Sequence, residues 1–171
     1  MGHAASEFMP VSIAVLTVSD TRGDAEDTSG HYLADEAKAA GHQVIDKRIV
    51  KDDIYQIRAI VSGWIADESV QSIVITGGTG FTTRDNTPEA ILPLFDREVE
   101  GFGELFRMLS YEDIGTSTLQ SRALAGIANH TVIFAVPGST NACRTAWEQI
   151  ILQQLDARHR PCNFIPHMRK K

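Results

Sequence analysis

The segment Ile73–Ala90 constrains the fold of this chain more than any other part of the sequence. An apolar, β-branched run ends at Thr76 and enters the glycine-rich turn Thr76-Gly77-Gly78-Thr79-Gly80. An acidic loop follows, and then the sequence Thr87-Pro88-Glu89-Ala90, which is typical of a helix start. This order places free backbone N–H groups, a carboxylate and a helix N-terminus at the carboxyl edge of a sheet, where open α/β folds bind phosphorylated ligands. The segment therefore predicts an anion-binding active site, and we expect the chain to be an enzyme.

Several runs have the character of buried parallel strands, and most of them are almost continuously apolar. They are Ser12–Val18, Gln43–Val50, Ser72–Thr76 and Thr131–Val136. Because helical patterns lie between them, we predict an α/β fold, a three-layer αβα sandwich whose doubly wound sheet is mostly parallel. The length of 171 residues, without repeats or linkers, fits one domain over residues 1–171. Within it, 156–171 contains two prolines and should form a C-terminal arm.

Helix caps and apolar stripes predict the helices between the first three strands. One helix should begin at a cap formed by Asp27 or Thr28 and stop near Gly41. A second should cover the apolar stripe Ile54–Ile65.

The second half of the chain should contain further helices. One should start at Thr87-Pro88-Glu89, with the threonine hydroxyl as its cap, and another should follow Ser139–Thr140. Between them we expect a helix around Glu104–Leu109 and irregular chain or short strands near Tyr111–Thr118.

The composition limits the classes of ligand and partner. The formal net charge is −6 and 22% of the residues are charged, so we expect neither a nucleic-acid partner nor a membrane surface. No apolar run approaches the length of a membrane span, and the polar start Met1–Glu7 is unlike a signal peptide. Cys143 and Cys162 form no metal-spaced cluster, and two free thiols fit a reducing cytoplasm. We therefore predict a cytoplasmic protein with small-molecule partners.

Polar residues follow each predicted strand, and the carboxyl ends of parallel strands meet at one edge of a sheet. These residues are Ser19 and Asp20, Asp52 and Asp53, the turn Thr76–Gly80, and Pro137-Gly138-Ser139. Alone, the glycine turn fits a tight strand-to-helix connection as well as a phosphate cradle, and it matches neither the P-loop nor the GxGxxG pattern. Asp85 and Thr87–Glu89, just downstream, favour the phosphate cradle.

The acidic residues have competing interpretations. Asp52 and Asp85 each follow a strand, and a Mg²⁺ held between them would relieve their repulsion and neutralise phosphate charge. Asp53 fits a helix cap better, whereas Asp20 is equally compatible with a cap and with the site. Ser121-Arg122 could supply either a phosphate-binding fork or a surface salt bridge. The histidines lack metal-ligand spacing, so we expect them at the surface or at helix ends.

An ordered set of motifs resembles the MoaB/MogA family of molybdenum-cofactor biosynthesis. The motifs are Thr76–Gly80, Arg84-Asp85-Asn86-Thr87-Pro88-Glu89-Ala90 and Pro137-Gly138-Ser139. The likeness runs from about Pro10 to Pro166. The opening, the segment Thr116–Arg122 and the C-terminal arm look most like the MoaB branch.

The resemblance implies a molybdopterin adenylyltransferase that uses ATP and molybdopterin as substrates together with Mg²⁺. The terminal phosphate of molybdopterin would attack the α-phosphorus of ATP and release pyrophosphate. The functional aspartates of the family correspond to Asp52 and Asp85, which would be catalytic and would hold the metal. The expected molybdopterin- and nucleotide-binding residues are Ser19, Asp20, Thr76, Gly77, Gly78, Thr79, Gly80, Thr87, Glu89, Ser121, Arg122, Pro137, Gly138 and Ser139.

The MoaB branch is not uniformly catalytic, so a second hypothesis is a non-catalytic molybdopterin- or nucleotide-binding assembly protein of the same pathway. Asp52 and the complete Arg84–Ala90 motif favour the enzyme, and the missing P-loop argues against a general nucleotide hydrolase. The resemblance also implies a homotrimer or a hexamer. We expect its contacts at the arm Leu155–Pro166 and at the helix Phe102–Leu109.

Overall fold

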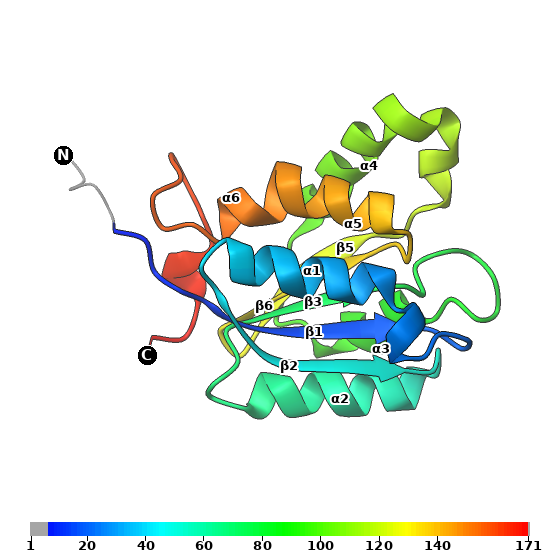
Figure 1. The fold of residues 1–171 in the computed structure, drawn as a ribbon, viewed down its shortest axis with the longest axis horizontal. Helices are drawn as coiled ribbons and strands as arrows, with labels where there is room; N and C mark the ends of the chain where they lie inside the picture. Colours follow the sequence, from blue (N-terminus) through cyan, green and yellow to red (C-terminus); the bar gives the residue numbers. More distant parts are fainter. Residues whose placement is uncertain (1–6, 171) are drawn as a thin grey trace.

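The computed structural model describes residues 7–170, which form a six-stranded sheet with helices on both faces (Figure 1). The strand order is β2-β1-β3-β6-β5-β4. Neighbours among β2, β1, β3 and β6 pair in parallel, and β5 is antiparallel to both β6 and β4. The strands are β1 Ser12–Val18, β2 Gln43–Val50, β3 Ser72–Thr76, β4 Arg97–Glu98, β5 Leu124–Ala128 and β6 Thr131–Val136. The predicted three-layer fold with a mostly parallel sheet is confirmed.

The helices divide between the two faces of the sheet, as the ribbon shows (Figure 1). The α-helices are α1 Thr28–Ala39, α2 Ile54–Ala66, α3 Thr87–Ile91, α4 Glu100–Ile114, α5 Thr140–Ala146 and α6 Leu152–Gln154. Short 3-10 helices are Asp24–Glu26, Leu92–Leu94, Gly115–Gln120 and Ile165–His167, and a π-helical turn, Trp147–Ile151, joins α5 to α6. One face carries α1, α4 and α5, and the other carries α2 and α3.

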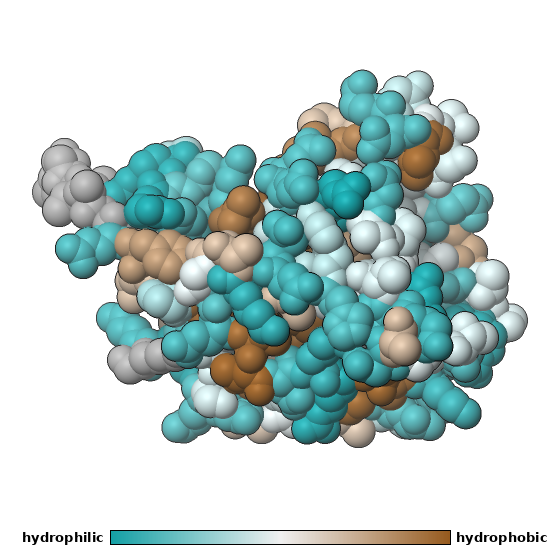
Figure 2. All heavy atoms as spheres, in the orientation of Figure 1, coloured by the Kyte–Doolittle hydropathy of each residue, from teal (hydrophilic) through white to brown (hydrophobic). Residues whose placement is uncertain are grey.

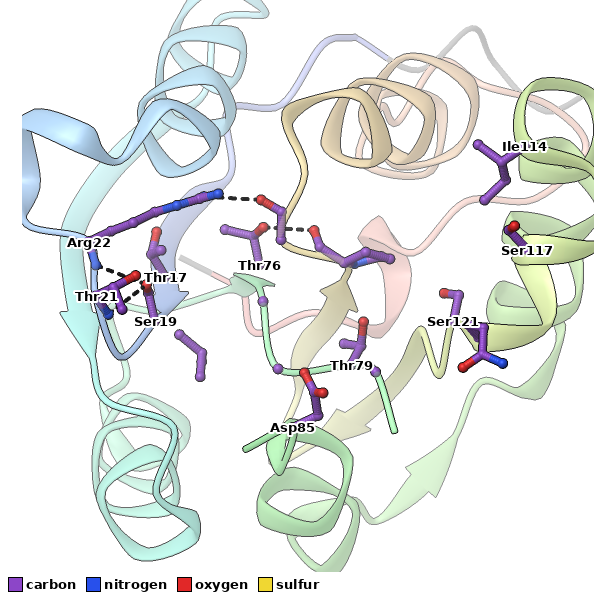
Figure 3. Close-up of a pocket in the computed structure, with 17 residues that line it drawn as sticks. Thr17, Ser19, Thr21, Arg22, Thr76, Thr79, Asp85, Ile114, Ser117 and Ser121 are labelled. Atoms are coloured by element: carbon purple, nitrogen blue, oxygen red, sulfur yellow. Dashed lines mark hydrogen bonds between the residues drawn. The ribbon is translucent and has the colours of Figure 1, made fainter. Parts of the chain in front are cut away.

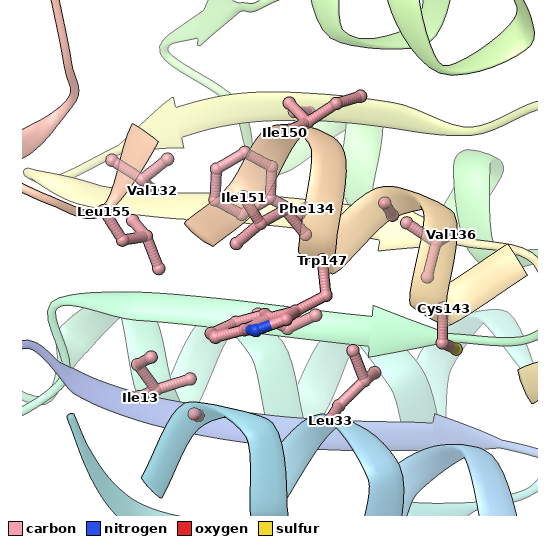
Figure 4. Close-up of a cluster of buried hydrophobic side chains, with 14 of the residues drawn as sticks. Ile13, Leu33, Val132, Phe134, Val136, Cys143, Trp147, Ile150, Ile151 and Leu155 are labelled. Carbon is pink, nitrogen blue, oxygen red and sulfur yellow. The ribbon is translucent and has the colours of Figure 1, made fainter. Parts of the chain in front are cut away.

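Each face of the sheet has its own hydrophobic core. Under α1 and α5, Trp147 packs near Ile13, Leu33 and Phe134, all at most 1% exposed (Figure 4). Under α2, Ile57 packs among strand residues of the opposite face, including Ile75. Alternate side chains of a strand point to opposite faces, so a strand covered on both sides is apolar along most of its length. β1, β3 and β6 are buried at every position, and polar side chains among them, such as Thr17 and Thr76, form hydrogen bonds.

Three of the expected helix caps are present. Asp27 caps α1 by accepting a hydrogen bond from the Gly30 N–H, and Asp53 caps α2 by accepting from two main-chain N–H groups. Ser139 caps α5 by accepting from the Ala142 N–H. Because a short polar side chain satisfies donors that the first helical turn leaves free, these residues fix where each helix begins.

The segment between α3 and β6 differs from our prediction. Helix α4 runs from Glu100 to Ile114 and a 3-10 helix continues from Gly115 to Gln120, so the expected irregular chain or strands near Tyr111–Thr118 are wrong. Apolar residues on the outer side of this helix, such as Met108 at 61% exposure, blur the periodicity that would have shown its length. Strands β4 and β5 were not predicted, because β4 consists of two exposed charged residues and β5, Leu-Ala-Gly-Ile-Ala, is made largely of alanine and glycine, which are depleted in strands.

The cap of α3 differs from expectation, and the histidine at the end of α1 has a buried side chain. Asn86, not Thr87, occupies the cap position of α3, and the Thr87 hydroxyl instead donates to the carbonyl of Gly77 at 2.8 Å. His42 lies at a helix end, as one of the two expectations for the histidines allowed, since its N–H donates to the Ala37 carbonyl of α1, but its side chain is only 5% exposed. Its Nδ1 accepts a hydrogen bond from the Val11 N–H at 3.1 Å, and Phe8 lies against its ring.

The C-terminal arm folds back beneath the amino ends of the strands. Met168 is buried in the core, and the Arg169 N–H donates to the carbonyl of His130 at 3.1 Å. The side chain of Gln71 donates to the carbonyl of Arg169. Lys171 and residues 1–6, where the polar start was expected, lie outside the described residues. None of the described helices combines the length and apolar character needed to cross a membrane.

Candidate active site

The loops after β1, β3 and β6 surround a cavity of about 440 Å³ at the carboxyl edge of the sheet (Figure 3). Connections from β1 and β3 leave toward opposite faces, which makes this edge a topological switch point, where α/β folds commonly bind ligands. The cavity is lined by Thr17, Val18, Ser19, Thr21, Arg22, Thr76, Gly77, Gly78, Thr79, Gly80, Asp85, Ile114, Ser117, Gln120, Ser121, Pro137 and Gly138. Its wall is therefore made mainly of small hydroxyl side chains and bare glycine backbone.

Many residues expected in the site do line this cavity. They are Ser19, Thr76, Gly77, Gly78, Thr79, Gly80, Asp85, Ser121, Pro137 and Gly138. The others, namely Asp20, Asp52, Thr87, Glu89, Arg122 and Ser139, lie behind or beside its wall and hold the lining loops through hydrogen bonds. The structure thus separates residues that can touch a ligand from residues that support them.

The glycine turn has a backbone that only glycine adopts easily. Gly77 and Gly78 have φ values of +100° and +70°, in the left-handed region that side chains disfavour. A Cβ on Gly77 would lie 2.2 Å from the Val18 carbonyl oxygen, and one on Gly78 would lie 2.3 Å from Thr87 Oγ1. The turn is therefore packed tightly from behind, while its front lines the open cavity.

Asp85 presents its carboxylate to the cavity from the loop that precedes α3 (Figure 3). Its Oδ2 accepts hydrogen bonds from the Thr82 N–H at 2.9 Å and from the Thr82 hydroxyl at 2.6 Å. Burial raises the pKa of this carboxyl, but the hydrogen bonds from Thr82 outweigh that effect, so the pKa lies below its ordinary value. Asp85 is therefore a fixed negative charge on the cavity wall at neutral pH.

Asp52 occupies a different environment, directly beneath the glycine turn. It is 3% exposed, and its Oδ1 accepts from both the N–H and the side-chain amide of Asn86, each at 2.9 Å. Its Oδ2 lies against Gly78, since a Cβ there would be 2.6 Å away. Burial raises the pKa of Asp52, the bonds from Asn86 lower it by less, and the nearby charges of Asp85 and Asp20 raise it further.

Asp20 links three loops at the edge of the cavity. Its two carboxylate oxygens accept from Arg84 Nε and Nη2 at 2.8 and 2.7 Å, and its Oδ1 also accepts from the Asp52 N–H at 3.0 Å. The Arg84 hydrogen bond, followed by the one from Asp52, lowers the pKa of Asp20 to about 2. Of the two roles left open for Asp20, a support for the site agrees better with this geometry than a helix cap, because Asp27 caps the following helix.

Arg122 holds the loop between the glycine turn and α3. Its Nε donates to the Gly80 carbonyl at 2.9 Å, its Nη2 to the Asp85 carbonyl at 2.7 Å, and its Nη1 forms an ion pair with Glu89. The guanidinium also lies 5.2 Å from the ring centre of Phe81. Of the two roles expected for Arg122, the salt bridge is present. The guanidinium donates to protein acceptors, namely Gly80, Asp85 and Glu89.

Part of the cavity wall was not predicted from the sequence. Thr21 and Arg22 directly follow Ser19 and Asp20, so extending the first strand-end loop by two residues would have included them. The opposite wall, from Ile114 to Gln120, comes from the end of α4 and the 3-10 helix after it. It had no local signal, because its position depends on how α4 packs on β5.

Within residues 7–170, no three or more histidine, cysteine, aspartate or glutamate side chains gather as ligands for a metal ion.

Cys143 is fully buried, with a pKa raised by burial to about 11, and its Sγ lies 3.2 Å from Thr76 Oγ1. It is a core thiol. A larger cavity, of about 880 Å³, lies between the N-terminal segment and the C-terminal arm, far from the glycine turn. Among the described residues, its wall contains no acidic side chain besides Glu7.

Comparison with known proteins agrees with the geometry. Residues 14–157 match the family described as "Probable molybdopterin binding domain". The chain is 68% identical over 170 residues to "Molybdenum cofactor biosynthesis protein B" of Escherichia coli K12, covering 99% of this chain and 100% of that protein. It is 44% identical over 146 residues to the protein of the same name from Bacillus subtilis, covering 85% and 86%.

Solved structures show the same architecture. A crystal structure of molybdenum cofactor biosynthesis protein B matches with a TM-score of 0.83 and 44% identity, covering 90% of this chain and 94% of that one. The tungsten cofactor synthesizing protein MoaB from Pyrococcus furiosus matches with a TM-score of 0.74 and 40% identity, covering 83% and 91%. A Mog protein from Mycobacterium ulcerans, at 22% identity, covers 86% and 98% and shares the fold with a TM-score of 0.73.

Proposed function

This chain belongs to the molybdenum cofactor biosynthesis protein B family, and from that premise we propose that its cavity binds molybdopterin and ATP and transfers the adenylyl group to the pterin. One observation carries the proposal. Among the described residues, the wall of the cavity of about 440 Å³ contains one acidic side chain, the ionised Asp85, beside the bare glycine turn. This volume is within the usual range for small-molecule sites, and exposed backbone suits close approach of a phosphate.

The proposed reaction joins two phosphorus centres. An oxygen of the terminal phosphate of molybdopterin forms a bond to the α-phosphorus of ATP. The bond from that phosphorus to the bridging oxygen breaks, and its electron pair leaves with pyrophosphate. Such a transfer needs alignment of the reactants and neutralisation of their charge more than it needs a nucleophilic side chain. The hydroxyls of Ser19, Thr79 and Ser121 supply hydrogen-bond donors around the cavity, whereas the Gly77 N–H of the turn already donates to the Val136 carbonyl.

The residues present fit a Mg²⁺ that arrives with the nucleotide. Mg²⁺ keeps several waters and is usually held by one or two carboxylates together with substrate phosphates. The absence of a cluster of three acidic, histidine or cysteine ligands in the described chain is compatible with that mode. Asp85 would hold the ion from the cavity wall, Asp52 would support Asp85 from behind the glycine turn, and the ion would supply charge neutralisation to the phosphates.

The structure suggests different roles for these two aspartates. Asp85 lines the cavity, so we propose that it contacts the bound substrate or its metal. Asp52 is buried and binds Asn86, which directly follows Asp85 in the chain. We propose that Asp52 fixes the position of Asp85 and the glycine turn.

The alternative remains a protein of the same pathway that binds the pterin or a nucleotide without turnover. One observation favours it, namely that Arg84 and Arg122 both point their donors at protein acceptors. Incubating the protein anaerobically with molybdopterin, ATP and Mg²⁺ separates the two hypotheses. Mass spectrometry should find a pterin product that is heavier by one adenylyl group. Bound but unmodified pterin would favour the alternative, and no binding would contradict both.

We also propose that the chain assembles as a homotrimer or a hexamer. Helix α4 exposes Leu105, Met108, Tyr111 and Ile114 at 39–61%, and Figure 2 shows apolar side chains at that end of the molecule. Apolar side chains grouped in this way commonly mark contacts between proteins. Light scattering should give a mass three or six times the 18.8 kDa of the chain.

We also propose a cytoplasmic location, because Cys143 and Cys162 are both free thiols.

A further inference from the structure

Arg22 is the one lysine or arginine that lines the cavity in the described part of the chain. It lies in the loop after β1 and reaches across to the turn after β6, where its Nη1 donates to the Gly138 carbonyl at 3.2 Å (Figure 3). Its own N–H donates to the Ser19 hydroxyl, which also accepts from the Thr21 N–H. The guanidinium is therefore aimed over the cavity by a fixed loop.

The charge of Arg22 is not neutralised by a carboxylate in residues 7–170. The acidic residues near it are engaged elsewhere, since Asp20 binds Arg84, Asp24 binds Lys47, and Glu26 accepts from the Gly23 N–H. Its guanidinium instead donates to a neutral carbonyl, that of Gly138. An arginine has five N–H donors in a planar fork, and the bond to Gly138 uses one of them.

The cavity wall has a positive charge, on Arg22, and a negative charge, on Asp85, in different places. This arrangement suits a ligand with a phosphate at one end. Arg22 approaches from the loop after β1, whereas Asp85 lies beside Thr79 of the glycine turn (Figure 3). Hydroxyl groups of Thr17, Ser19 and Thr21 surround the arginine side. A phosphate prefers a guanidinium, which can bind two of its oxygens, over a carboxylate, which repels it.

We propose that Arg22 binds a phosphate group of the ligand and so selects phosphorylated over unphosphorylated molecules. The inference rests on the proposed function, because it places one phosphate of the same ligands. The phosphate belongs either to the pterin or to the nucleotide, and binding measurements with both distinguish the two. Arg22 would exchange its single bond to Gly138 for charge-assisted bonds to the phosphate.

The test is equilibrium binding to the full-length protein of four probes. They are molybdopterin, the same pterin after phosphatase treatment, ATP, and adenosine. In Arg22→Gln, affinity for one phosphorylated probe should fall roughly 10- to 100-fold, the usual effect of losing a hydrogen bond to a charged group. Its phosphate-free counterpart should bind as it does to the wild type. Arg22→Lys should recover part of the loss, because lysine keeps the charge but not the fork.

Arg97→Gln is the matched control, since Arg97 is an exposed arginine on the edge strand β4, far from the cavity. It should leave all four affinities unchanged. A loss confined to the pterin pair assigns the phosphate to the pterin, and a loss confined to the nucleotide pair assigns it to ATP. Unchanged discrimination in Arg22→Gln, with normal binding by the wild type, would overturn the inference alone. Failure of the wild type to bind molybdopterin would overturn the proposed function.

Discussion

The carboxylate of Asp52 accepts two hydrogen bonds from Asn86, one from its main-chain N–H and one from its side-chain amide, both at 2.9 Å. Asn86 adjoins Asp85, so the buried aspartate after β2 determines where the cavity-lining aspartate after β3 lies. The same carboxylate contacts Gly78 from behind. Two aspartates that look equivalent in the sequence thus occupy a supporting and a ligand-facing position.

Replacing Asp52 by asparagine should change how stability depends on pH. Folding raises the pKa of Asp52 above its ordinary 3.8, chiefly by burial. Between those two values the native state binds more protons than the unfolded state, so wild-type stability falls as the pH rises. Asp52→Asn removes this effect while keeping an oxygen that can accept from Asn86.

Urea unfolding at several pH values measures the prediction. The stability of Asp52→Asn relative to wild type should increase from pH 4 to pH 7, by about 1.4 kcal/mol for each unit by which folding raises the pKa. A difference that stays constant or decreases over this range would show that Asp52 is not a destabilised buried acid.

Asp85→Asn should stop turnover while the protein stays folded. Asparagine is nearly the same size and can still accept from Thr82, so the loop should keep its shape. Loss of the charge that faces the cavity should lower the adenylylation rate by at least ~100-fold, as loss of a key electrostatic group usually does. Thermal unfolding and pterin binding should change little.

The control for Asp85→Asn is Asp53→Asn. It removes one carboxylate from the neighbouring loop but leaves the cap of α2 intact, because asparagine caps helices as well as aspartate does. Its turnover should be normal. If both variants turned over at the wild-type rate, Asp85 would have no role in the mechanism.

Arg122→Lys should loosen the loop that carries Asp85. Lysine keeps the positive charge but cannot donate at once to Gly80, Asp85 and Glu89, as Arg122 does. The variant should lose about 1–3 kcal/mol of stability, and amide hydrogen exchange should accelerate over residues 81–89. Arg97→Lys, on the exposed edge strand, should have no such effect. Unchanged exchange in Arg122→Lys would indicate that other contacts position the loop.

Gly78→Ala should damage both stability and ligand binding. The backbone at Gly78 has a φ of +70°, and a methyl group there would collide with Thr87 Oγ1 and with Asp52 Oδ2. We expect the free energy of unfolding to fall by more than ~1 kcal/mol, measured by urea unfolding, together with loss of pterin affinity.

Gly63→Ala provides the contrast, because Gly63 lies within α2 and an added methyl group would meet no neighbouring side chain within 4 Å. That substitution should stabilise the protein by roughly 0.5–1 kcal/mol. Equal effects of the two substitutions would contradict the strain assigned to the turn.

The central strands were predictable from the sequence because their physical requirement is local. A strand buried on both faces must be apolar at most positions, and β1, β3 and β6 end where that run ends. β4 has no such pattern, since Arg97 and Glu98 become a strand only by pairing with Gly126 and Ile127. Its position is decided by tertiary contacts that no local window contains.

The site was likewise predictable only where its residues directly follow a strand. Residues that directly follow strands, such as Ser19 and the glycine turn, were expected in the cavity and do line it. The supporting role of Asp52 could not be predicted, because it depends on Asn86, which lies 34 positions away in the sequence. The engagement of Arg122 with the loop around Asp85 is likewise a product of the fold.

Pyrophosphate release from ATP, measured with and without molybdopterin at fixed Mg²⁺, shows whether this cavity joins molybdopterin to the adenylyl group of ATP. We expect release that requires the pterin in the wild type and is almost absent in Asp85→Asn. Tight pterin binding by the wild type without any pyrophosphate would contradict the proposed transfer and would identify the chain as a binding protein of the same pathway.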